Sequence, residues 1–401
     1  MFSKEITNLP SIVYSNNNNC KIIVNLEFDT SLKESFIDDY IKKIVNNNSI
    51  LRSKIEKKDN KFFLIELEDF DINKKFLIKK TSYNNFDKEL DYLINNDLEN
   101  NTKWFLYICI DEENNKSRIY FKIDHSYADG YQIIKILTSP FSEIDNTVHF
   151  KRQTTFLNKI YYFLYGTLYL LISFIIYVIK SFFNYYFINY SINNNNTDGT
   201  EFIQESFDFD IVKEYTKRKN ITINDFFYAI MVKSNNNYTG INQKISCISP
   251  INISNLEDIN NMLGLYVTID NDLNNKLLTT KIHEIFNTCK YSVGFILLSY
   301  LQKSLFNIFG ESLILKLYDI FISNVEYCYT NVIGPDFNKI KKLGANKVSF
   351  FSKVQKKEIC FNIISFNNKL NMNICFRKGF IKDKEKFKNS IKNAFDDIIN
   401  N

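Results

Sequence analysis

The stretch 118-RIYFKIDHSYADGYQIIKIL-137 decides how this chain is interpreted. It runs apolar and extended into His125, passes through Asp129 and Gly130, and then changes to helical spacing near Tyr131. The whole chain of 401 residues has only 3 histidines. A strand end holds the imidazole rigidly, and a glycine behind it leaves room for backbone and substrate to approach.

His125 is therefore the candidate general base. The unperturbed pKa of histidine, about 6.5, lets the side chain accept and return a proton near neutral pH. Asp129 could align the imidazole directly, as in a catalytic triad, or it could anchor the loop through a distant Arg or Lys. Because no Ser or Cys stands in a nucleophile-elbow motif, direct transfer between two bound substrates is favoured over a covalent enzyme intermediate.

The remaining sequence alternates strand and helix patterns in both halves, which predicts an α/β fold of two similar lobes. The expected domains are residues 1–152, 153–192 and 193–401. Strands are expected at 21–28, 62–67, 104–110, 118–123, 244–253 and 325–333, with a hairpin over 356–376 that turns at 367–369. Amphipathic helices are expected at 31–45, 222–233 and 383–399.

An uncharged apolar stretch, 160-IYYFLYGTLYLLISFIIYVI-179, lies between the two lobes and is followed by 182-FFNYYFINY-190. Its length meets the threshold for a transmembrane helix. A buried core helix is the alternative. A single span would place the two lobes on opposite sides of the bilayer, and the many Tyr and Phe residues are typical of the headgroup layer. We therefore expect a membrane-associated helix that lies in one leaflet.

Composition excludes some classes of protein and partner. The chain is 45% hydrophobic, so it is not a disordered protein, and its net charge of +5 is spread along the sequence. This charge weakly favours binding to an anionic membrane surface and is too small to indicate nucleic-acid binding. The 7 cysteines are odd in number and form no C-x-x-C motif, which indicates reduced, mostly buried thiols. The start of the sequence has no apolar segment of a secretory signal.

Four further motifs follow in order along the chain. Trp104 stands in 102-TKWFLY-107, and an Asn-Asp helix start stands at Asn224 and Asp225. A proline-containing strand is written 248-ISPINIS-254, and 331-NVIGP-335 comes last. Together with the His-x-x-x-Asp-Gly motif, they resemble the chloramphenicol acetyltransferase and condensation-domain superfamily of acyl-CoA-dependent acyltransferases. More narrowly, the chain resembles the wax ester synthase/diacylglycerol acyltransferase family over nearly its whole length.

The resemblance implies two chloramphenicol-acetyltransferase-like lobes that meet along a tunnel, with acyl-CoA and an alcohol entering from opposite sides. His125 would deprotonate the hydroxyl, and Asp129 would mainly hold the loop. The implied substrate-binding residues are Trp104, Gly130, Asn224, Asp225, Asn331, Gly334 and Pro335. For Asn224 and Asp225, a simple helix cap is the alternative.

Three positions depart from the family pattern. The first of two motif histidines is Asp124 here, the Pro-Leu before Trp104 is Thr102-Lys103, and the Arg expected after the proline-containing strand is Asn255 or absent. Strand alternation sends residues 124 and 125 to opposite faces. A carboxylate at 124 could raise the pKa of His125 if the loop brings the two together. His149 and His283 are interpreted as ordinary surface or helix residues.

The expected function is a membrane-associated O-acyltransferase that makes neutral lipid esters from long-chain acyl-CoA and a fatty alcohol or diacylglycerol. Its expected location is the endoplasmic reticulum membrane, with the lobes facing the cytosol. Acyl-CoA is expected as a co-substrate, with no bound cofactor, no metal and no nucleic-acid partner. The alternatives are an acyltransferase for a small soluble alcohol or amine, and an inactive membrane-bound homologue that acts in binding or as a scaffold.

Overall fold

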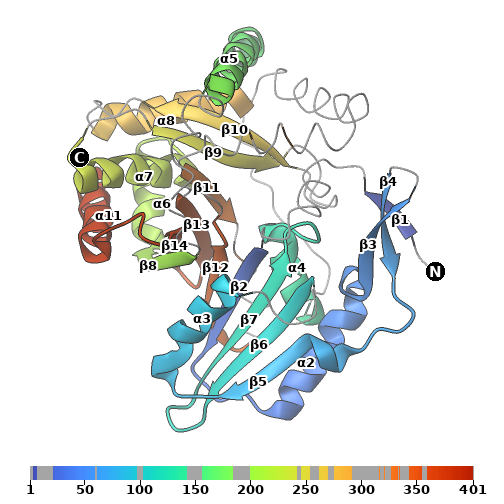
Figure 1. Ribbon diagram of the computed structural model, residues 1–401. Helices are drawn as coiled ribbons and strands as arrows, with labels where there is room; N and C mark the ends of the chain where they lie inside the picture. Colours follow the sequence, from blue (N-terminus) through green and yellow to red (C-terminus); the bar gives the residue numbers. More distant parts are fainter. Residues whose placement is uncertain are drawn as a thin grey trace.

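The computed structural model describes most of the chain, and every structural statement below concerns this part. The described residues are 3–6, 21–58, 61–96, 103–141, 156–183, 199–241, 245–252, 262–269, 275–290, 316, 320, 327–332, 334, 343–354 and 359–400. Two sheets flanked by helices form two lobes (Figure 1). The predicted α/β fold class is confirmed.

A five-stranded sheet forms the base of the N-terminal lobe, in the order β12-β2-β7-β6-β5. Neighbouring strands are antiparallel except for β5 and β6, which are parallel. The strands are β2 (Lys21–Phe28), β5 (Phe76–Lys80), β6 (Trp104–Asp111), β7 (Lys116–Asp124) and β12 (Ala345–Ser352). A smaller sheet lies beside it in Figure 1 and consists of β1 (Ser3–Ile6), β4 (Lys61–Glu66) and β3 (Ser53–Lys58).

Helices cover both faces of the five-stranded sheet because its side chains alternate. Ile22 and Val24 pack into the core that includes α2 and α4, whereas Ile23 packs into the core that includes α3. Successive side chains of a strand point to opposite faces, which explains this division. The helices are α2 (Glu34–Asn47), α3 (Phe86–Asn95) and α4 (Gly130–Thr138).

The strands predicted at 104–110 and 118–123 are confirmed, and they form the hairpin that leads to His125. β6 and β7 pair antiparallel, with Asp111 opposite Lys116. The turn contains Asn115 at φ 50°, a conformation that asparagine tolerates better than most residues. Asp111 stabilises the turn, since its carboxylate accepts hydrogen bonds from the backbone N–H and the side-chain amide of Asn114 at 3.0 and 2.7 Å. The chain is thus turned back towards the candidate site by local chemistry.

The C-terminal lobe contains a six-stranded sheet in the order β10-β9-β11-β13-β14-β8. Its strands are β8 (Thr200–Asp208), β9 (Ile245–Asn252), β10 (Met262–Ile269), β11 (Tyr327–Val332), β13 (Ile359–Phe366) and β14 (Lys369–Arg377). The helices are α6 (Phe209–Arg218), α7 (Ile223–Thr239), α8 (Asn275–Lys290) and α11 (Lys384–Ile399). The predicted hairpin of β13 and β14 turns at Asn367 and Asn368, both at positive φ, as in the tight turns of hairpins.

The helix α7 is the centre of this lobe. Every side chain from Phe226 to Val232 is buried, so the helix has no polar face over two turns. A helix that is hydrophobic all round must be enclosed by other elements. The elements packed around α7 therefore fix the position of its N-terminal end.

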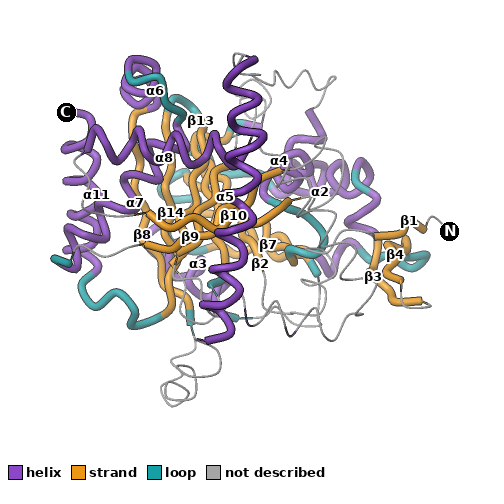
Figure 2. The backbone as a smooth tube through the Cα atoms, turned by 90° about the horizontal axis from the view of Figure 1, so that it is seen from above, coloured by secondary structure: helices purple, strands orange, loops and turns teal. Residues whose placement is uncertain are grey.

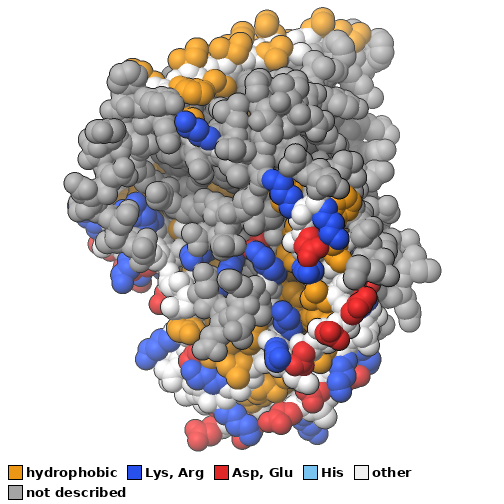
Figure 3. Space-filling view, turned by 45° about the vertical axis from the view of Figure 1, so that its right-hand side comes forward, with side chains coloured by type: hydrophobic (Ala, Val, Ile, Leu, Met, Phe, Trp, Pro, Cys, Tyr) orange, Lys and Arg blue, Asp and Glu red, His pale blue; other side chains and the backbone are white. Residues whose placement is uncertain are grey.

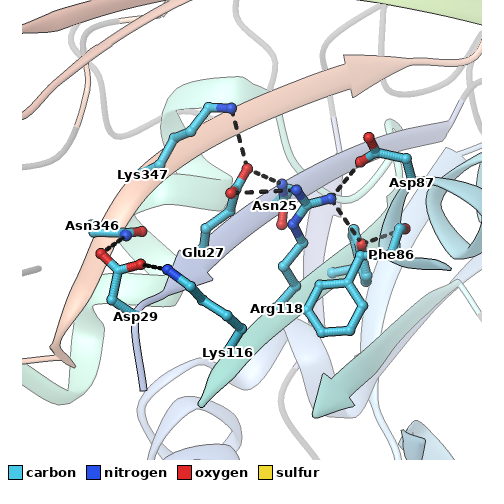
Figure 4. A network of polar contacts seen from close by, with 10 residues as sticks. Asn25, Glu27, Asp29, Phe86, Asp87, Lys116, Arg118, Asn346 and Lys347 are labelled. Atoms are coloured by element: carbon cyan, nitrogen blue, oxygen red, sulfur yellow. Dashed lines mark hydrogen bonds and ion pairs between the residues drawn. The ribbon is translucent and has the colours of Figure 1, made fainter. Parts of the chain in front are cut away.

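One strand crosses between the lobes. β12 lies in the predicted C-terminal lobe by sequence, yet it pairs antiparallel with β2 in the N-terminal sheet. Figure 4 shows the polar network across this edge, in which buried Arg118 contacts Glu27 at 3.4 Å and also pairs with Asp87, while Lys347 of β12 reaches Glu27 at 3.3 Å. The strand exchange ties the two halves together, and the three domain ranges stay a prediction.

The apolar stretch between the lobes forms a helix, α5 (Phe156–Phe183), which is longer than the 160–179 stretch. It packs beside α8 and β10 at the outer end of the C-terminal sheet (Figures 1 and 2). Among the described residues, no helix combines the length and the hydropathy that crossing a membrane requires. The expected helix that lies in one leaflet stays a prediction.

The cysteines of the described residues are free. Cys109, Cys247, Cys289, Cys360 and Cys375 are buried and Cys328 is partly buried. Burial raises the pKa of the Cys109 and Cys289 thiols to about 12, so these side chains stay protonated at neutral pH. The predicted reduced and mostly buried thiols are confirmed for this part of the chain.

Candidate active site

The candidate base lies in the loop that follows β7. His125 is partly buried there, directly after the last strand residue, Asp124. The Asp124 carboxylate accepts hydrogen bonds from the backbone N–H and the hydroxyl of Ser126 at 3.0 and 2.6 Å. It also pairs with Lys103 at 3.4 Å. Asp124 thus stabilises the turn that carries His125.

Two departures from the family pattern meet in this contact. Lys103 stands where the resemblance expects a leucine, and Asp124 stands where it expects a histidine. The two residues are joined by their side chains and by a backbone hydrogen bond from Asp124 N to Lys103 O at 2.7 Å. Because Asp124 is buried, its negative charge requires such partners. Lys103 thus supplies a positive charge beside the buried Asp124 carboxylate.

Asp129 begins the helix α4. Its carboxylate accepts the backbone N–H of Gln132 at 2.9 Å, and the Gln132 side chain accepts the backbone N–H of Asp129 at 3.1 Å. This reciprocal capping box satisfies two amide groups that the first turn of a helix leaves unpaired. Asp129 therefore caps α4 and fixes the end of the loop that carries His125.

A second capping box begins α7 in the other lobe. The Thr222 hydroxyl accepts the backbone N–H of Asp225 at 3.2 Å, and the Asp225 carboxylate accepts the backbone N–H of Thr222 at 2.7 Å. Asp225 is buried, whereas Asn224 extends towards the end of β11. The helix-cap interpretation of Asp225 is thus confirmed, and Asn224 has a separate partner.

Asn224 forms a hydrogen bond with the end of β11. The Asn331 amide donates to Asn224 Oδ1, and the Tyr329 hydroxyl lies 3.5 Å from the same oxygen. Burial, and then the negative charge of Asp225, raise the pKa of Tyr329 well above its usual value, so its hydroxyl remains a donor. The predicted site residues Asn224 and Asn331 are therefore brought together.

The lobes touch at a motif glycine. A Cβ atom placed on Gly130 would lie 2.6 Å from Cγ2 of Val332, the neighbour of Asn331. Val332 also packs into the core of the N-terminal lobe. Only a residue without a side chain allows this approach. The contact sets the start of α4, five residues after His125, against the strand end that holds Asn224.

Gly334 has a second close approach. A Cβ atom at this position would lie 1.4 Å from the Ser365 carbonyl oxygen, and the Gly334 N–H donates to the Ser365 hydroxyl at 3.2 Å. The glycine is required by backbone packing between the end of β11 and β13. Pro335, the remaining residue of that motif, lies outside the described residues, as do Asn255 and His149.

Trp104 is placed in the core. Its side chain is 2% exposed, and its indole N–H donates to the Leu51 carbonyl at 2.7 Å. This arrangement explains the residue by packing and hydrogen bonding alone. A substrate contact of Trp104 stays a prediction, and so does the tunnel between the lobes.

The sequence interpretation missed His283 and Asn287 on α8. His283 is a helix residue, as expected, but its side chain is only 17% exposed and its Nδ1 lies 2.6 Å from Asp225 Oδ2. Its Nε2 lies 2.8 Å from Asn287 Nδ2. The spacing of four residues places His283 and Asn287 on one helix face, which was the available signal. Their partner, Asp225, is far away in sequence and could not be read from the pattern.

Groups of metal-binding side chains were also sought in the part of the chain that the structure covers. No three His, Cys, Asp or Glu side chains gather there as a metal site. The arrangement offers a histidine, two asparagines and a buried aspartate–histidine pair instead, which are groups suited to proton transfer and hydrogen bonding.

Comparison with known proteins adds a family and a fold. Residues 262–399 match the family model of the WS/DGAT C-terminal domain. No curated protein sequence matches the chain. The predicted resemblance to the wax ester synthase/diacylglycerol acyltransferase family is thus confirmed by this C-terminal region.

Solved structures share the two-lobed fold. The wax ester synthase/diacylglycerol acyltransferase from Marinobacter aquaeolei VT8 superposes with a TM-score of 0.61 at 10% identity, and 98% of each chain is covered. The TRI3 trichothecene 15-O-acetyltransferase from Fusarium sporotrichioides has a TM-score of 0.60 at 13% identity, with 99% of this chain and 95% of that chain covered. A condensation domain of the monacolin K polyketide synthase MokA has a TM-score of 0.59 at 7% identity, with 100% and 97% covered.

Proposed function

We propose that the chain is an O-acyltransferase. This proposal starts from the match of residues 262–399 to the WS/DGAT C-terminal domain and from the two-lobed fold. It transfers a long-chain acyl group from acyl-CoA to a fatty alcohol or a diacylglycerol. The observation that supports this function best is the Gly130–Val332 contact, because it joins the His125 loop of one lobe to the Asn224–Asn331 pair of the other. A reaction between two bound substrates needs groups from both lobes in one place.

In the proposed reaction, His125 accepts the proton of the acceptor hydroxyl. The alcohol oxygen attacks the thioester carbonyl carbon and forms the new C–O bond. The C–S bond then breaks, and the departing CoA sulfur takes the proton back from the imidazolium. General base assistance of this kind contributes about 10²–10⁴ in rate.

Asp129 supports the reaction by holding the loop. Its carboxylate oxygen is used by the backbone N–H of Gln132 in the α4 cap. The rigid cap fixes the backbone four residues after His125, which limits the loss of orientation that a mobile base would cause.

The test is ester formation by the purified full chain with palmitoyl-CoA and hexadecan-1-ol, followed by release of free CoA and by product chromatography. His125→Ala is expected to lower kcat by at least about 10². Tyr92→Ala, which removes an exposed ring from α3, is the control. Equal ester formation by wild type and His125→Ala would exclude His125 as the base.

A small soluble acceptor is the second candidate. It is favoured by the fold shared with the trichothecene 15-O-acetyltransferase, whose match covers nearly all of both chains. Acetyl-CoA with a panel of short alcohols and amines distinguishes the two candidates. A kcat/KM higher for these pairs than for palmitoyl-CoA and hexadecan-1-ol would favour the small acceptor, and no transfer in either assay would favour the inactive homologue.

The helix α5 supports membrane association as part of this function. Large apolar side chains recur on it every three or four residues and are exposed, among them Leu164 and Ile179 at 64% and Ile176 at 59%. Hydrophobic side chains form a band along the top edge in Figure 3, where α5 lies in Figure 1. Tyr169 of the same helix packs on the C-terminal lobe. A continuous exposed apolar stripe fits the headgroup boundary of one leaflet.

We place the protein on the cytosolic face of the endoplasmic reticulum membrane, where the lipid acceptors and products dissolve in the same bilayer. Flotation with phosphatidylcholine–phosphatidylserine vesicles tests the contact. The triple variant Leu164→Gln, Ile176→Gln, Ile179→Gln is expected to lose most binding, since burial of each such side chain contributes roughly 1.5–3 kcal/mol. Exposed apolar residues elsewhere provide the control, Leu77→Gln, Ile211→Gln, Ile241→Gln. Equal flotation of the two variants would contradict docking through α5.

A further inference from the structure

Asp225 is a buried carboxylate that the proposed proton transfer does not use. Its residue is 1% exposed, and its Oδ2 lies 2.7 Å from the Thr222 N–H and 2.6 Å from His283 Nδ1. The capping box needs only the first of these contacts. The Thr222 hydroxyl would cap the helix even without a negative charge at position 225. The second contact brings in α8, a different element of the lobe. A buried negative charge is stabilised only where such donors are in place.

The two ring nitrogens of His283 have different partners. The Asn287 amide nitrogen can only donate, so Nε2 of His283 accepts from it at 2.8 Å. The proton of the neutral ring then lies on Nδ1 and is donated to Asp225 Oδ2. With Nε2 occupied, His283 has no free nitrogen to accept a proton from a substrate. Asn287 therefore sets the tautomer, and His283 acts as a donor and not as a second base.

Through Asp225, His283 contacts the first turn of α7, which leads to the candidate site. Asp225 is preceded by Asn224, whose side-chain oxygen accepts from Asn331 and is approached by Tyr329. Val332, the next residue of that strand, lies against Gly130 at the start of α4. The first turn of α7 is thus held from two sides, by α8 through His283 and by β11 through Asn331.

We infer that His283 is a positioning residue for the proposed acyl transfer: oriented by Asn287, it holds Asp225 and thereby keeps Asn224 and the end of β11 in register with the His125 loop. The inference rests on the proposed function for its catalytic consequence. Small misplacements of groups that orient substrates lower rates strongly, and a displacement of 1 Å can lower a rate about 10²-fold. A role confined to packing would lower stability and leave the turnover of the folded protein unchanged.

Three substitutions at one position separate these roles. His283→Phe keeps the ring and removes both nitrogens. His283→Asn places an amide donor near the position of Nδ1, and His283→Gln places it near Nε2, away from Asp225. Tyr327→Phe is the matched control, because it removes another buried hydrogen bond between α7 and β11, the one from the Tyr327 hydroxyl to Asn235.

The assay is ester formation from palmitoyl-CoA and hexadecan-1-ol at a temperature where each variant is folded. His283→Phe and His283→Gln are expected to lower kcat about tenfold or more, with KM for palmitoyl-CoA changed less than about threefold. His283→Asn is expected to restore kcat to within about threefold of wild type. Tyr327→Phe is expected to lose stability with little loss of kcat. Unchanged kcat in His283→Phe, or losses in all four variants that follow their melting temperatures, would overturn the inference.

Hydrogen exchange of the full chain gives a readout that needs no activity. Amides in residues 222–226 are expected to exchange faster in His283→Phe than in wild type, to be protected again in His283→Asn, and to be unaffected in Tyr327→Phe. If wild type forms no ester, the proposed function fails while this exchange pattern still decides whether His283 holds the first turn of α7. Equal protection in wild type and His283→Phe would overturn the inference whatever the activity.

Discussion

The helix starts of α4 and α7 carry the two motif regions that meet between the lobes, and they are held in different ways. Both are closed by a capping box, Asp129 with Gln132 in α4 and Thr222 with Asp225 in α7. The α4 start is also set against β11 by the close approach of Gly130 to Val332. The α7 box is additionally tied to α8 through His283 and, through Asn224, to β11.

The difference follows from what each start must do. The α4 start holds a loop that continues directly from a rigid strand, and an apolar contact places it against β11. The α7 start begins a helix buried on every side, so its orientation depends on the elements that enclose it. A local cap fixes backbone direction, whereas contacts to distant elements fix position in the lobe.

The largest difference is expected between the two motif glycines. In Gly334→Ala, the new Cβ meets the Ser365 carbonyl, a backbone atom that cannot rotate away, so the free energy of unfolding is expected to fall by about 3 kcal/mol. In Gly130→Ala, the new Cβ meets only a methyl group of Val332, and the expected loss is about 1 kcal/mol. Urea unfolding monitored by circular dichroism measures both. A larger loss in Gly130→Ala would show that the contact between the lobes tolerates an added methyl group less well than the contact of Gly334 with Ser365 does.

Substitution of Asp129 tests whether the α4 start acts only as a cap. Asp129→Ala is expected to lower the free energy of unfolding by about 1 kcal/mol, while Asp129→Asn should keep it within about 0.5 kcal/mol because asparagine caps as well as aspartate. Ester formation by Asp129→Asn is expected to fall less than about tenfold. A loss near 10⁴ would instead indicate an aspartate that aligns the imidazole of His125.

A double-mutant cycle tests the distant tie of the α7 start. Asn224→Ala, Asn331→Ala and the double variant are compared by urea unfolding. Because the two side chains share one hydrogen bond, their effects should be non-additive by about 0.5 kcal/mol or more. The comparison pair, Asp129→Ala and Asn331→Ala, changes two different elements, α4 and β11, and is expected to be additive. Additivity in both cycles would remove the distinction between the two helix starts.

The smallest effect is expected at a third helix start, that of α6. The backbone N–H of Ile211, and then Lys369, hold the pKa of the Asp208 cap below its usual value. A lowered folded-state pKa adds stability that is fully present above the unfolded-state pKa, about 3.9, and is lost as the pH falls through the folded-state value. The stability advantage of wild type over Asp208→Asn should therefore shrink between pH 5 and pH 3, measured by urea unfolding. An advantage that grows on acidification would contradict this sign.

Much of the fold could be predicted from local patterns. Strand alternation placed β2, β6 and β7, and helical periodicity placed α2 and α11, each within a few residues of its observed bounds. The exchange of β12 into the N-terminal sheet could not be predicted, because strand pairing between distant segments leaves no periodic signal. The sequence also could not predict which side of α5 is exposed, because apolar residues lie on almost every side of this helix.

By itself, the sequence determined strands such as β2, β6 and β7, the His125 loop with its Asp-Gly turn, and the helix start at Asn224 and Asp225. These features depend on residues within about five positions of one another, where spacing along the chain equals proximity in space. The tertiary structure alone decided that Lys103 pairs with Asp124, that Val332 lies against Gly130, and that His283 holds Asp225. Such contacts join elements whose distance along the chain carries no information about their packing.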